Sequence, residues 1–272
     1  MSTYVISGVA RGIGFEFVRQ LSANPANTVF GLVRDKGAAD KKYQAEGLSR
    51  KNIHILQADV TDYDALKATS EYVSGVTGGK LDYIIANHGA VSDLSAFDNL
   101  SNLAKDPVSL EQDLMESIKI NVLGTISMFN LFMPLVLKGN GKKAIAISTG
   151  MADVDLVAKY DVQVSPTYAI SKAALNMAVA KLSAVLREQG ILLMTISPGF
   201  VDTGNFNRSL TPEQQKSVEG MVKGFARYAP HFKGAITPEE SVRLTLSVLE
   251  RSSIEAGDAG SWVSHYGNKQ WL

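Results

Sequence analysis

A three-glycine turn joins a strand to a helix in the segment Thr3-Tyr-Val-Ile-Ser-Gly8-Val-Ala-Arg-Gly12-Ile-Gly14. Gly8 permits a tight turn at the end of the strand, Gly12 leaves room for a phosphate beside the backbone, and Gly14 lets the helix pack close to a sheet. The first turn of such a helix offers free N–H groups and the positive end of its dipole to phosphates. The segment therefore predicts a nucleotide-binding unit, with Arg11 and Ile13 in the same turn.

Apolar, β-branched runs alternate with helical patterns along the rest of the chain. We expect strands at Thr3–Ser7, Thr28–Val33, Ile53–Gln57, Leu81–Ala86, Ala144–Ser148, Leu192–Ser197 and Gly260–Ser264. We expect helices at Gly14–Leu21, Asp64–Val73, Leu110–Leu137, Pro166–Glu188 and Glu239–Arg251. Continuously apolar strands separated by helices predict an α/β fold: a Rossmann-type, doubly wound, seven-stranded parallel sheet with helices on both faces.

Length and composition predict one soluble domain. The 272 residues suit a single α/β domain over residues 1–272, and 45% hydrophobic residues can bury a large core. The least regular stretch, at about 200–237, predicts a mobile loop-helix excursion beside a substrate. A formal net charge of +0 argues against binding nucleic acid or an anionic membrane surface.

Residue usage narrows the chemistry and the location. There are no cysteines, which excludes disulfides and thiolate sites, and His54, His88, His231 and His265 lack metal-ligand spacing, so we expect no metal. The residues after Met1 already read as a strand, and no uninterrupted apolar stretch approaches about eighteen residues. We therefore expect a cytoplasmic protein that does not enter a membrane.

Tyr168 and Lys172 open a long helical pattern and are spaced i,i+4, so they share one helix face. A phenol has a pKa of about 10 and is a poor base at neutral pH, but a nearby cation and an oxidised nicotinamide favour its ionised form. Tyr168 could then donate a proton to a carbonyl oxygen, or remove one from an alcohol. By itself the spacing is common in surface helices.

The end of the second strand indicates the nucleotide. Sites selective for NAD place an acid there to bind the ribose 2′-hydroxyl, whereas here Val33 occupies that place and Arg34 follows. A guanidinium at Arg34, helped by Arg11, can bind a 2′-phosphate. We therefore favour NADP(H), while Arg34 as an ordinary surface charge and Asp35 as an inward-facing acid remain open.

These motifs occur together in an order that resembles the short-chain dehydrogenase/reductase family over nearly the whole chain. The final segment, Gly260 to Trp271, is similar to that of carbonyl-reductase-like members, the sniffer or C-factor group. The resemblance implies that Asn121 joins Lys172 in a proton relay. It also implies a cofactor site formed by Gly8, Arg11, Gly12, Ile13, Gly14, Arg34, Asp59, Val60, Asn87, Gly89, Tyr168, Lys172, Pro198, Gly199, Val201 and Thr203.

A serine near the end of the fifth strand usually completes this family's catalytic group. Here the chain reads Ile147-Ser148-Thr149-Gly150. Alignment on the common pattern favours Thr149, with Ser148 as the alternative, because alternating side chains let only one face the site.

The resemblance implies reduction of a ketone or aldehyde to an alcohol, or the reverse, with Tyr168 as proton donor and a small-molecule carbonyl or alcohol as substrate. The alternatives are a non-redox lyase, isomerase or cyclase on the same fold, and a non-catalytic NADP(H)-binding regulator. Relatives pair through the long helices that correspond to Leu110–Leu137 and Pro166–Glu188, so we expect a homodimer or homotetramer. We expect the substrate walls at Val91–Pro107, Met151–Val164 and Asn205–Ala235.

Overall fold

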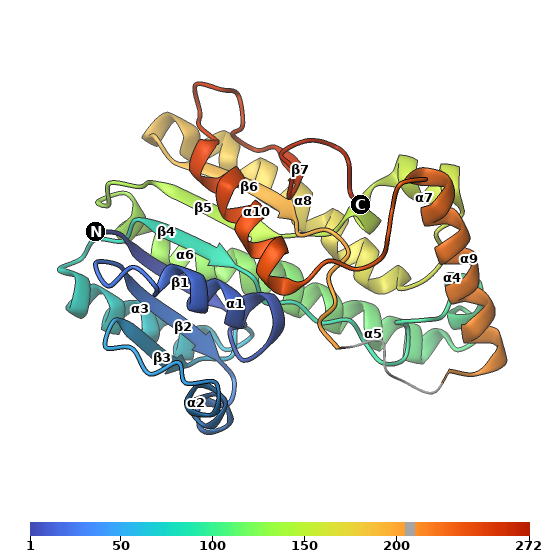
Figure 1. Ribbon diagram of the computed structural model, residues 1–272, viewed down its shortest axis with the longest axis horizontal. Helices are drawn as coiled ribbons and strands as arrows, with labels where there is room; N and C mark the ends of the chain where they lie inside the picture. Colours follow the sequence, from blue (N-terminus) through green and yellow to red (C-terminus); the bar gives the residue numbers. More distant parts are fainter. Residues whose placement is uncertain (205–209) are drawn as a thin grey trace.

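A single seven-stranded parallel sheet forms the centre of the molecule. The computed structural model describes residues 1–204 and 210–272. The strand order is β3-β2-β1-β4-β5-β6-β7, and every neighbouring pair is parallel (Figure 1). The strands are β1 (Thr3–Ser7), β2 (Thr28–Val33), β3 (Ile53–Gln57), β4 (Tyr83–Ala86), β5 (Lys143–Ile147), β6 (Leu192–Ser197) and β7 (Trp262–Ser264). The predicted doubly wound α/β fold is confirmed.

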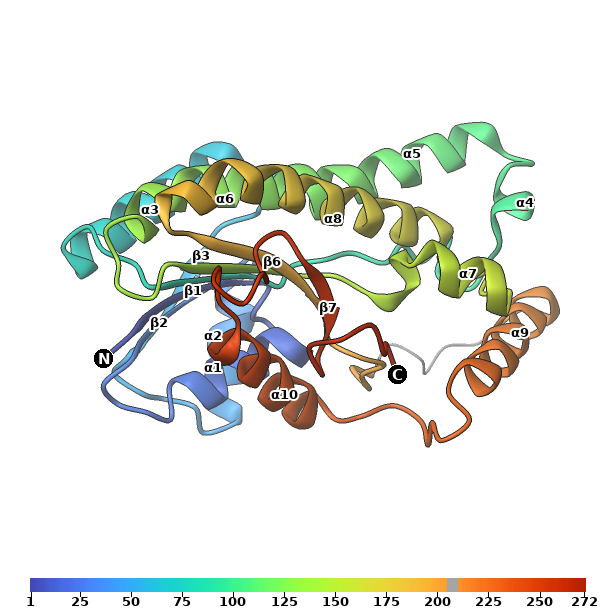
Figure 2. The same cartoon turned by 90° about the horizontal axis from the view of Figure 1, so that it is seen from above.

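Helices cover both faces of this sheet (Figure 2). One face carries α3 (Tyr63–Thr77), α5 (Pro107–Ile118), α6 (Gly124–Val136) and α8 (Pro166–Leu186), and the other carries α1 (Gly12–Leu21), α2 (Lys36–Ala45) and α10 (Pro238–Arg251). A separate apolar core lies on each face, one around Phe129 and Phe132 of α6 and one around Phe17 of α1. The strands are therefore buried on both sides, as their continuous hydrophobicity predicts.

Three short elements and one longer helix lie beyond the carboxyl ends of the strands. They are α4 (Leu100–Leu103), the 3₁₀ helix η2 (Gly150–Ala152), α7 (Val154–Tyr160) and α9 (Pro212–Tyr228); a further 3₁₀ turn, η3 (Arg187–Gln189), ends α8. Figures 1 and 2 show α4, α7 and α9 together at this end of the molecule. Because ligands of open α/β sheets bind outside the carboxyl ends of the strands, these elements enclose the candidate site.

Three features depart from the sequence-based expectation. The predicted helix Leu110–Leu137 is α5, a π-helical segment η1 (Lys119–Leu123) and α6 in succession. The predicted excursion at about 200–237 contains the regular helix α9; its mobility stays a prediction, and residues 205–209 lie outside the described part. Strands β4, β5 and β7 differ from the predicted limits by one or two residues, which is usual at element ends.

Two helical stretches, Pro107–Val136 and Pro166–Gln189, are long and apolar enough to span a membrane by length and composition. The expectation that no such stretch exists was based on uninterrupted apolar runs. It is wrong when the hydropathy is averaged along these two stretches. Core helices of soluble proteins pass the same test, and α6 and α8 contribute buried side chains such as Phe132 and Leu175 to the core on their face of the sheet. The result is therefore weak evidence for a membrane span.

Candidate active site

A cavity of about 640 Å³ lies where the strand order reverses between β1 and β4. Residues that follow six strands line it: the turn after β1, Arg34 after β2, Ala58–Thr61 after β3, Asn87–Val91 after β4, Ser148–Met151 after β5, and Pro198–Val201 with Thr203 after β6. The volume lies within the range of about 300–1,000 Å³ that is usual for small-molecule sites. All the predicted site residues line this cavity except Asn121, which is fully buried behind it.

The glycine turn leaves no room for side chains where it meets the rest of the site. A Cβ atom added to Gly14 would lie 2.1 Å from the carbonyl oxygen of Gly8, and Gly8 itself has a positive φ of 70°. No side chain of the described residues caps the start of α1, and its first turn holds no acidic residue. The free N–H groups of α1 and the close backbone therefore form a cradle that fits a pyrophosphate.

The side chains of Arg34 and Asp35, which follow β2, have different positions. Asp35 caps α2, its carboxylate accepting the Ala38 N–H at 2.9 Å, whereas Arg34 lines the cavity. Arg34 also acts on Asp59: burial raises the pKa of this carboxyl, but hydrogen bonds from Thr61 and the charges of Arg34 and Lys119 outweigh burial and lower it. The alternative that Asp35 is an inward-facing acid is therefore excluded in this structure, whereas the role of Arg34 in binding a 2′-phosphate stays a prediction.

Tyr168 is paired with Thr149 rather than with Ser148. Burial raises the pKa of Tyr168 to about 12, and a hydrogen bond with Thr149 acts in the opposite direction. The hydroxyl of Ser148 is buried and has no hydrogen-bond partner among the described residues. Burial has the largest effect on the pKa of this phenol, and the expected lowering by Lys172 together with an oxidised nicotinamide stays a prediction. The phenol is therefore protonated at neutral pH, the form that donates a proton.

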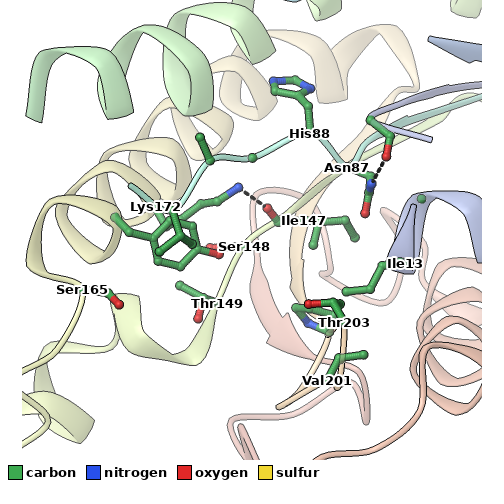
Figure 3. A pocket seen from close by; sticks show the side chains of 18 of the residues that line it. Ile13, Asn87, His88, Ile147, Ser148, Thr149, Ser165, Lys172, Val201 and Thr203 are labelled. Carbon is green, nitrogen blue, oxygen red and sulfur yellow. Dashed lines mark hydrogen bonds between the residues drawn. The ribbon is translucent and has the colours of Figure 1, made fainter. Parts of the chain in front are cut away.

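Lys172 lies beside this pair with 2% of its surface exposed. Its ammonium donates a hydrogen bond to the Ile147 carbonyl at 2.7 Å (Figure 3) and lies 5.8 Å from the centre of the Tyr168 ring. Burial lowers the pKa of Lys172 to about 7. The i,i+4 spacing thus directs both functional groups to one point, at the end of β5.

Asn121 holds the loop that follows β4 against the catalytic helix. Its side-chain oxygen accepts the Ala90 N–H at 3.0 Å, and its Nδ2 donates to the Ser171 hydroxyl at 2.8 Å. Asn121 lies in the π-helical segment, and π-helical turns in long helices are frequent at functional sites. A Cβ on Gly89 would lie 3.3 Å from the Lys172 Nζ and 3.5 Å from the Asn121 Oδ1, so the three groups converge.

His88 lines the cavity and also takes part in a buried hydrogen-bond chain behind it. Its ring points away from Lys172 in Figure 3 and lies 2.6 Å from the Ser7 hydroxyl and 3.1 Å from that of Thr125. Ser7 also accepts the His88 N–H, and Thr125 donates to the Asn121 carbonyl. All four bonds are satisfied when Nε2 carries the ring proton and Ser7 donates to Nδ1. Burial and the charge of Lys172 lower the pKa of His88 to about 3, so the ring is neutral.

The Pro198–Thr203 segment closes the opposite side of the cavity. Gly199 has a positive φ of 85° and lies against the ring of His265, 2.6 Å from where a Cβ would be. Thr203 approaches Gly12, with its Cγ2 3.3 Å from the position of a Cβ there. Pro198, Gly199, Val201 and Thr203 therefore line the cavity opposite the glycine turn, and their contact with a cofactor stays a prediction.

The substrate half of the cavity was only partly predicted. The expected regions supply Val91, Ala96 and Phe97 from one wall, Met151, Leu156 and Val164 from the second, and Met221 and Phe225 from the third. Glu116, Ser165, Trp271 and Leu272 also line the cavity and were not predicted to do so. No local pattern marks these four residues, because tertiary packing brings them to the site.

The glycine turn, strands β1 to β6 and the Tyr168 helix fall within residues 2–214, which match the family model of short chain dehydrogenases. The chain is 53% identical to the short chain dehydrogenase virK of Hypocrea virens over 272 residues, which are the whole of both chains. It is 44% identical over 273 residues to the short-chain dehydrogenase/reductase iacC of Pestalotiopsis fici, again over the full length of both.

Solved structures with the same fold include two carbonyl reductases. The NADPH-bound carbonyl reductase from chicken fatty liver superposes with a TM-score of 0.76 and 25% identity, over 98% of each chain. The carbonyl reductase Sniffer of D. melanogaster gives a TM-score of 0.76 with 22% identity, over 98% of each chain. At that identity the second likeness concerns the fold alone.

Proposed function

This chain belongs to the short chain dehydrogenase family, and we propose that it is an NADP(H)-dependent oxidoreductase that reduces a ketone or aldehyde to an alcohol, or catalyses the reverse. The observation that carries the proposal is the convergence of Tyr168, Thr149 and Lys172 at one end of the cavity that the glycine turn opens. A phenol paired with a hydroxyl and a cation is suited to move a proton at a carbonyl oxygen.

The residues present fit a dinucleotide. The cradle formed by Gly8, Gly12 and Gly14 suits its pyrophosphate, and Lys172 lies where it can donate to ribose hydroxyls. Arg34 and Arg11 line the cavity, whereas Asp35 is engaged in capping α2, which supports a 2′-phosphate rather than a free 2′-hydroxyl. The NADPH-bound relative of known structure supports the same choice.

The chain's own residues account for the proton. NADPH supplies the hydride when bound, and the substrate carbon that accepts it leaves its oxygen in need of one proton. Tyr168 donates that proton from its hydroxyl, and Thr149 holds the substrate oxygen and the phenol together by hydrogen bonds. Lys172 stabilises the phenolate that remains, and Asn121 positions Lys172 through the loop at Gly89.

We also propose that the protein is a homodimer or homotetramer. Apolar side chains remain exposed on α5, α8 and the π-helical segment: Val108, Met115, Leu123, Ile170, Met177 and Val185. Single exposed apolar residues are ordinary, but six on helices that lie on one face of the sheet support a subunit contact.

An NADPH-depletion screen over aromatic, polyketide-like and simple aliphatic ketones tests the function, with NADH in parallel. We expect at least one ketone to consume NADPH in equal amount to the alcohol formed, with NADPH preferred. Arg34→Ala should weaken that preference by about 10- to 100-fold, because a charged hydrogen bond contributes about 1.5–3 kcal/mol. If no carbonyl compound elicits NADPH consumption, the reductase proposal fails, and equal rates with both cofactors would remove the role of Arg34.

A further inference from the structure

Trp271 packs against Gly150, the residue that follows Thr149, whose hydroxyl is proposed to hold the substrate oxygen. It lines the cavity and is 2% exposed. Gly150 directly follows Thr149, and a Cβ on Gly150 would lie 2.5 Å from the Trp271 Cβ and 2.7 Å from its Cγ. The indole therefore packs on the backbone next to Thr149, where the substituents of a bound carbonyl compound extend.

Four contacts fix Trp271 in place. The indole N–H donates to the Asp153 carboxylate at 2.7 Å, and the backbone N–H donates to the Tyr228 hydroxyl at 3.0 Å. The ring stacks on Trp262 with centroids 4.3 Å apart, and Lys269 lies over both rings. A residue held by one hydrogen bond from its indole, one from its backbone and a stacking contact forms a rigid wall.

The two hydrogen-bond partners of Trp271 belong to elements beside the substrate half of the cavity. Asp153 also caps α7 through the N–H groups of Asp155 and Leu156, and Tyr228 ends α9. Both views of the ribbon place the end of the chain near β7 and α7 (Figures 1 and 2). Leu272 packs with Met221 and Phe225 of α9. Trp271 thus joins the two helices that border the substrate half.

The substrate half of the cavity, which Trp271 borders, is lined mainly by apolar side chains. The other residues of this half are Val91, Ala96, Phe97, Met151, Leu156, Val164, Phe200, Met221, Phe225 and Leu272, with Ser165 and Glu116 as polar members. Arginine and lysine side chains that line the described part of the cavity belong to its cofactor and catalytic half: Arg11, Arg34 and Lys172. Glu116 is the one charged side chain among the described residues that line this half, so an anionic substituent there would be buried without a partner.

We propose that Trp271 is a specificity-determining residue that limits the size of the substrate, and that the substrate class is an uncharged, mainly apolar carbonyl compound. This inference rests on the proposed function and concerns the same site. Removing the indole opens the cavity beside Thr149 without touching the residues proposed to bind the cofactor. Specificity for size should therefore change while cofactor binding does not.

The test compares the wild type with Trp271→Ala and Trp271→Phe on aryl ketones of increasing ring number, each with a matched derivative that carries a carboxylate. The ratio of kcat/KM for the largest to the smallest ketone should rise by about 10-fold or more in Trp271→Ala, because even one methylene in an apolar pocket changes this ratio by about 10- to 200-fold. Trp271→Phe should give an intermediate ratio. The carboxylate derivatives should be poor substrates of all three proteins, and the Kd for NADPH should stay constant.

Trp262→Phe is the matched control, because Trp262 packs on Trp271 but does not line the cavity. An unchanged size ratio in Trp271→Ala, an equal change in Trp262→Phe, or a preference for the carboxylates would overturn the proposal. Equilibrium dialysis of the same ketones in the presence of NADP⁺ repeats the size comparison without turnover. A wild type that binds ketones but never reduces them would disprove the proposed function, while the dialysis would still test whether Trp271 limits the size of the ligand. If the alanine variant does not fold, Trp271→Phe is compared with the wild type instead.

Discussion

Ser148 and Thr149 are adjacent hydroxyl residues with different surroundings. Thr149 is hydrogen-bonded to Tyr168 and begins the 3₁₀ helix η2, whose Met151 N–H it accepts at 3.2 Å. Ser148 follows β5 and is 1% exposed, its N–H still bonded to the Ile196 carbonyl. The backbone thus turns at Thr149, which brings its hydroxyl, and not that of Ser148, to the phenol.

Exchanging each hydroxyl for a methyl group separates the two roles. Thr149→Val should lower kcat by about 10²- to 10³-fold, the usual cost of removing one donor to a reacting oxygen. Ser148→Ala should retain activity near that of the wild type, because the hydroxyl that it removes has no partner among the described residues. Steady-state kinetics with a ketone found in the screen measure both, and a larger loss in Ser148→Ala would reverse the assignment.

The buried His88 predicts a pH-dependent stability. The pKa of His88 falls from 6.5 to about 3 on folding, so between these values the unfolded chain binds a proton that the folded chain does not. Stability is therefore complete above about pH 6.5 and is lost as the pH falls toward 3, with a slope of up to about 1.4 kcal/mol per pH unit for one histidine. His265, whose pKa burial lowers to about 4, acts in the same direction.

Urea unfolding between pH 4.5 and pH 8 measures this effect above the range in which carboxylates titrate. The wild type should lose stability below about pH 6.5, and His88→Gln, which cannot titrate, should show a shallower slope. His231→Gln is the control, because His231 lies on the surface of the protein. Identical slopes for the wild type and His88→Gln would contradict the buried neutral ring.

At the scale of elements, the site depends on how closely α1 approaches the turn after β1. The helix can begin there because Gly14 carries no side chain that would collide with the Gly8 carbonyl. Gly75 in α3 has no such role, because no described atom lies within 4 Å of a Cβ added there. This glycine therefore lowers the stability of the helix only through its backbone entropy.

Gly14→Ala should displace α1 from the turn and raise the Kd for NADPH by at least about tenfold, because the N–H groups of its first turn would move away from the pyrophosphate. Gly75→Ala should leave the Kd unchanged and stabilise the protein by about 0.5–1 kcal/mol. Fluorescence titration with NADPH and thermal unfolding measure both variants. Equal cofactor affinity in Gly14→Ala and the wild type would show that this turn does not bind the pyrophosphate.

The elements that the sequence predicted best are those with local patterns. Strands β1, β2, β3 and β6 have the predicted limits, because continuous apolar runs mark strands that are buried on both faces. Helix α9 was predicted only as part of a loop-helix excursion without limits, although Thr211 and Gln214 form a capping box on either side of Pro212, a signal that would have located its start. Helix α2 was missed because its segment is mainly polar and has only two buried residues.

The residues of the site likewise divide into those that local motifs predict and those that only the folded structure brings to the cavity. Its cofactor half consists of motifs at strand ends, so their order along the chain predicts them. Trp271 and Glu116 reach the cavity through tertiary packing, and neither has a neighbour in sequence that indicates it. The π-helical segment likewise has no recognised pattern, so the sequence indicated the role of Asn121 only through a resemblance and not its geometry.

At the scale of the whole molecule, the two faces of the sheet differ in what they leave exposed. Helices α5 and α8 keep apolar side chains at the surface, among them Met115 at 59% and Met177 at 61% exposure. Their outer surface is thus the strongest candidate for contact with a second subunit. The residues that line the cavity lie beyond the carboxyl ends of the strands, so pairing through these helices is compatible with access to the site.

Met177→Glu should therefore convert the oligomer to a smaller species, because a charge buried in an apolar contact lacks a partner. Size-exclusion chromatography with light scattering measures the mass. The control is Val76→Glu, an exposed apolar position on α3 that should leave the mass unchanged. A wild type that is monomeric at every concentration tested would contradict the proposed subunit contact.

The central claim, that Tyr168 donates the proton in an NADPH-dependent carbonyl reduction, is tested most directly by Tyr168→Phe. The measurement is NADPH oxidation with a ketone found in the screen, together with the Kd for NADPH of the same preparation. We predict that kcat falls by about 10²- to 10⁴-fold, the usual contribution of a positioned general acid, while the Kd stays within about threefold of the wild type. A Tyr168→Phe variant that oxidises NADPH at the wild-type rate would contradict the account.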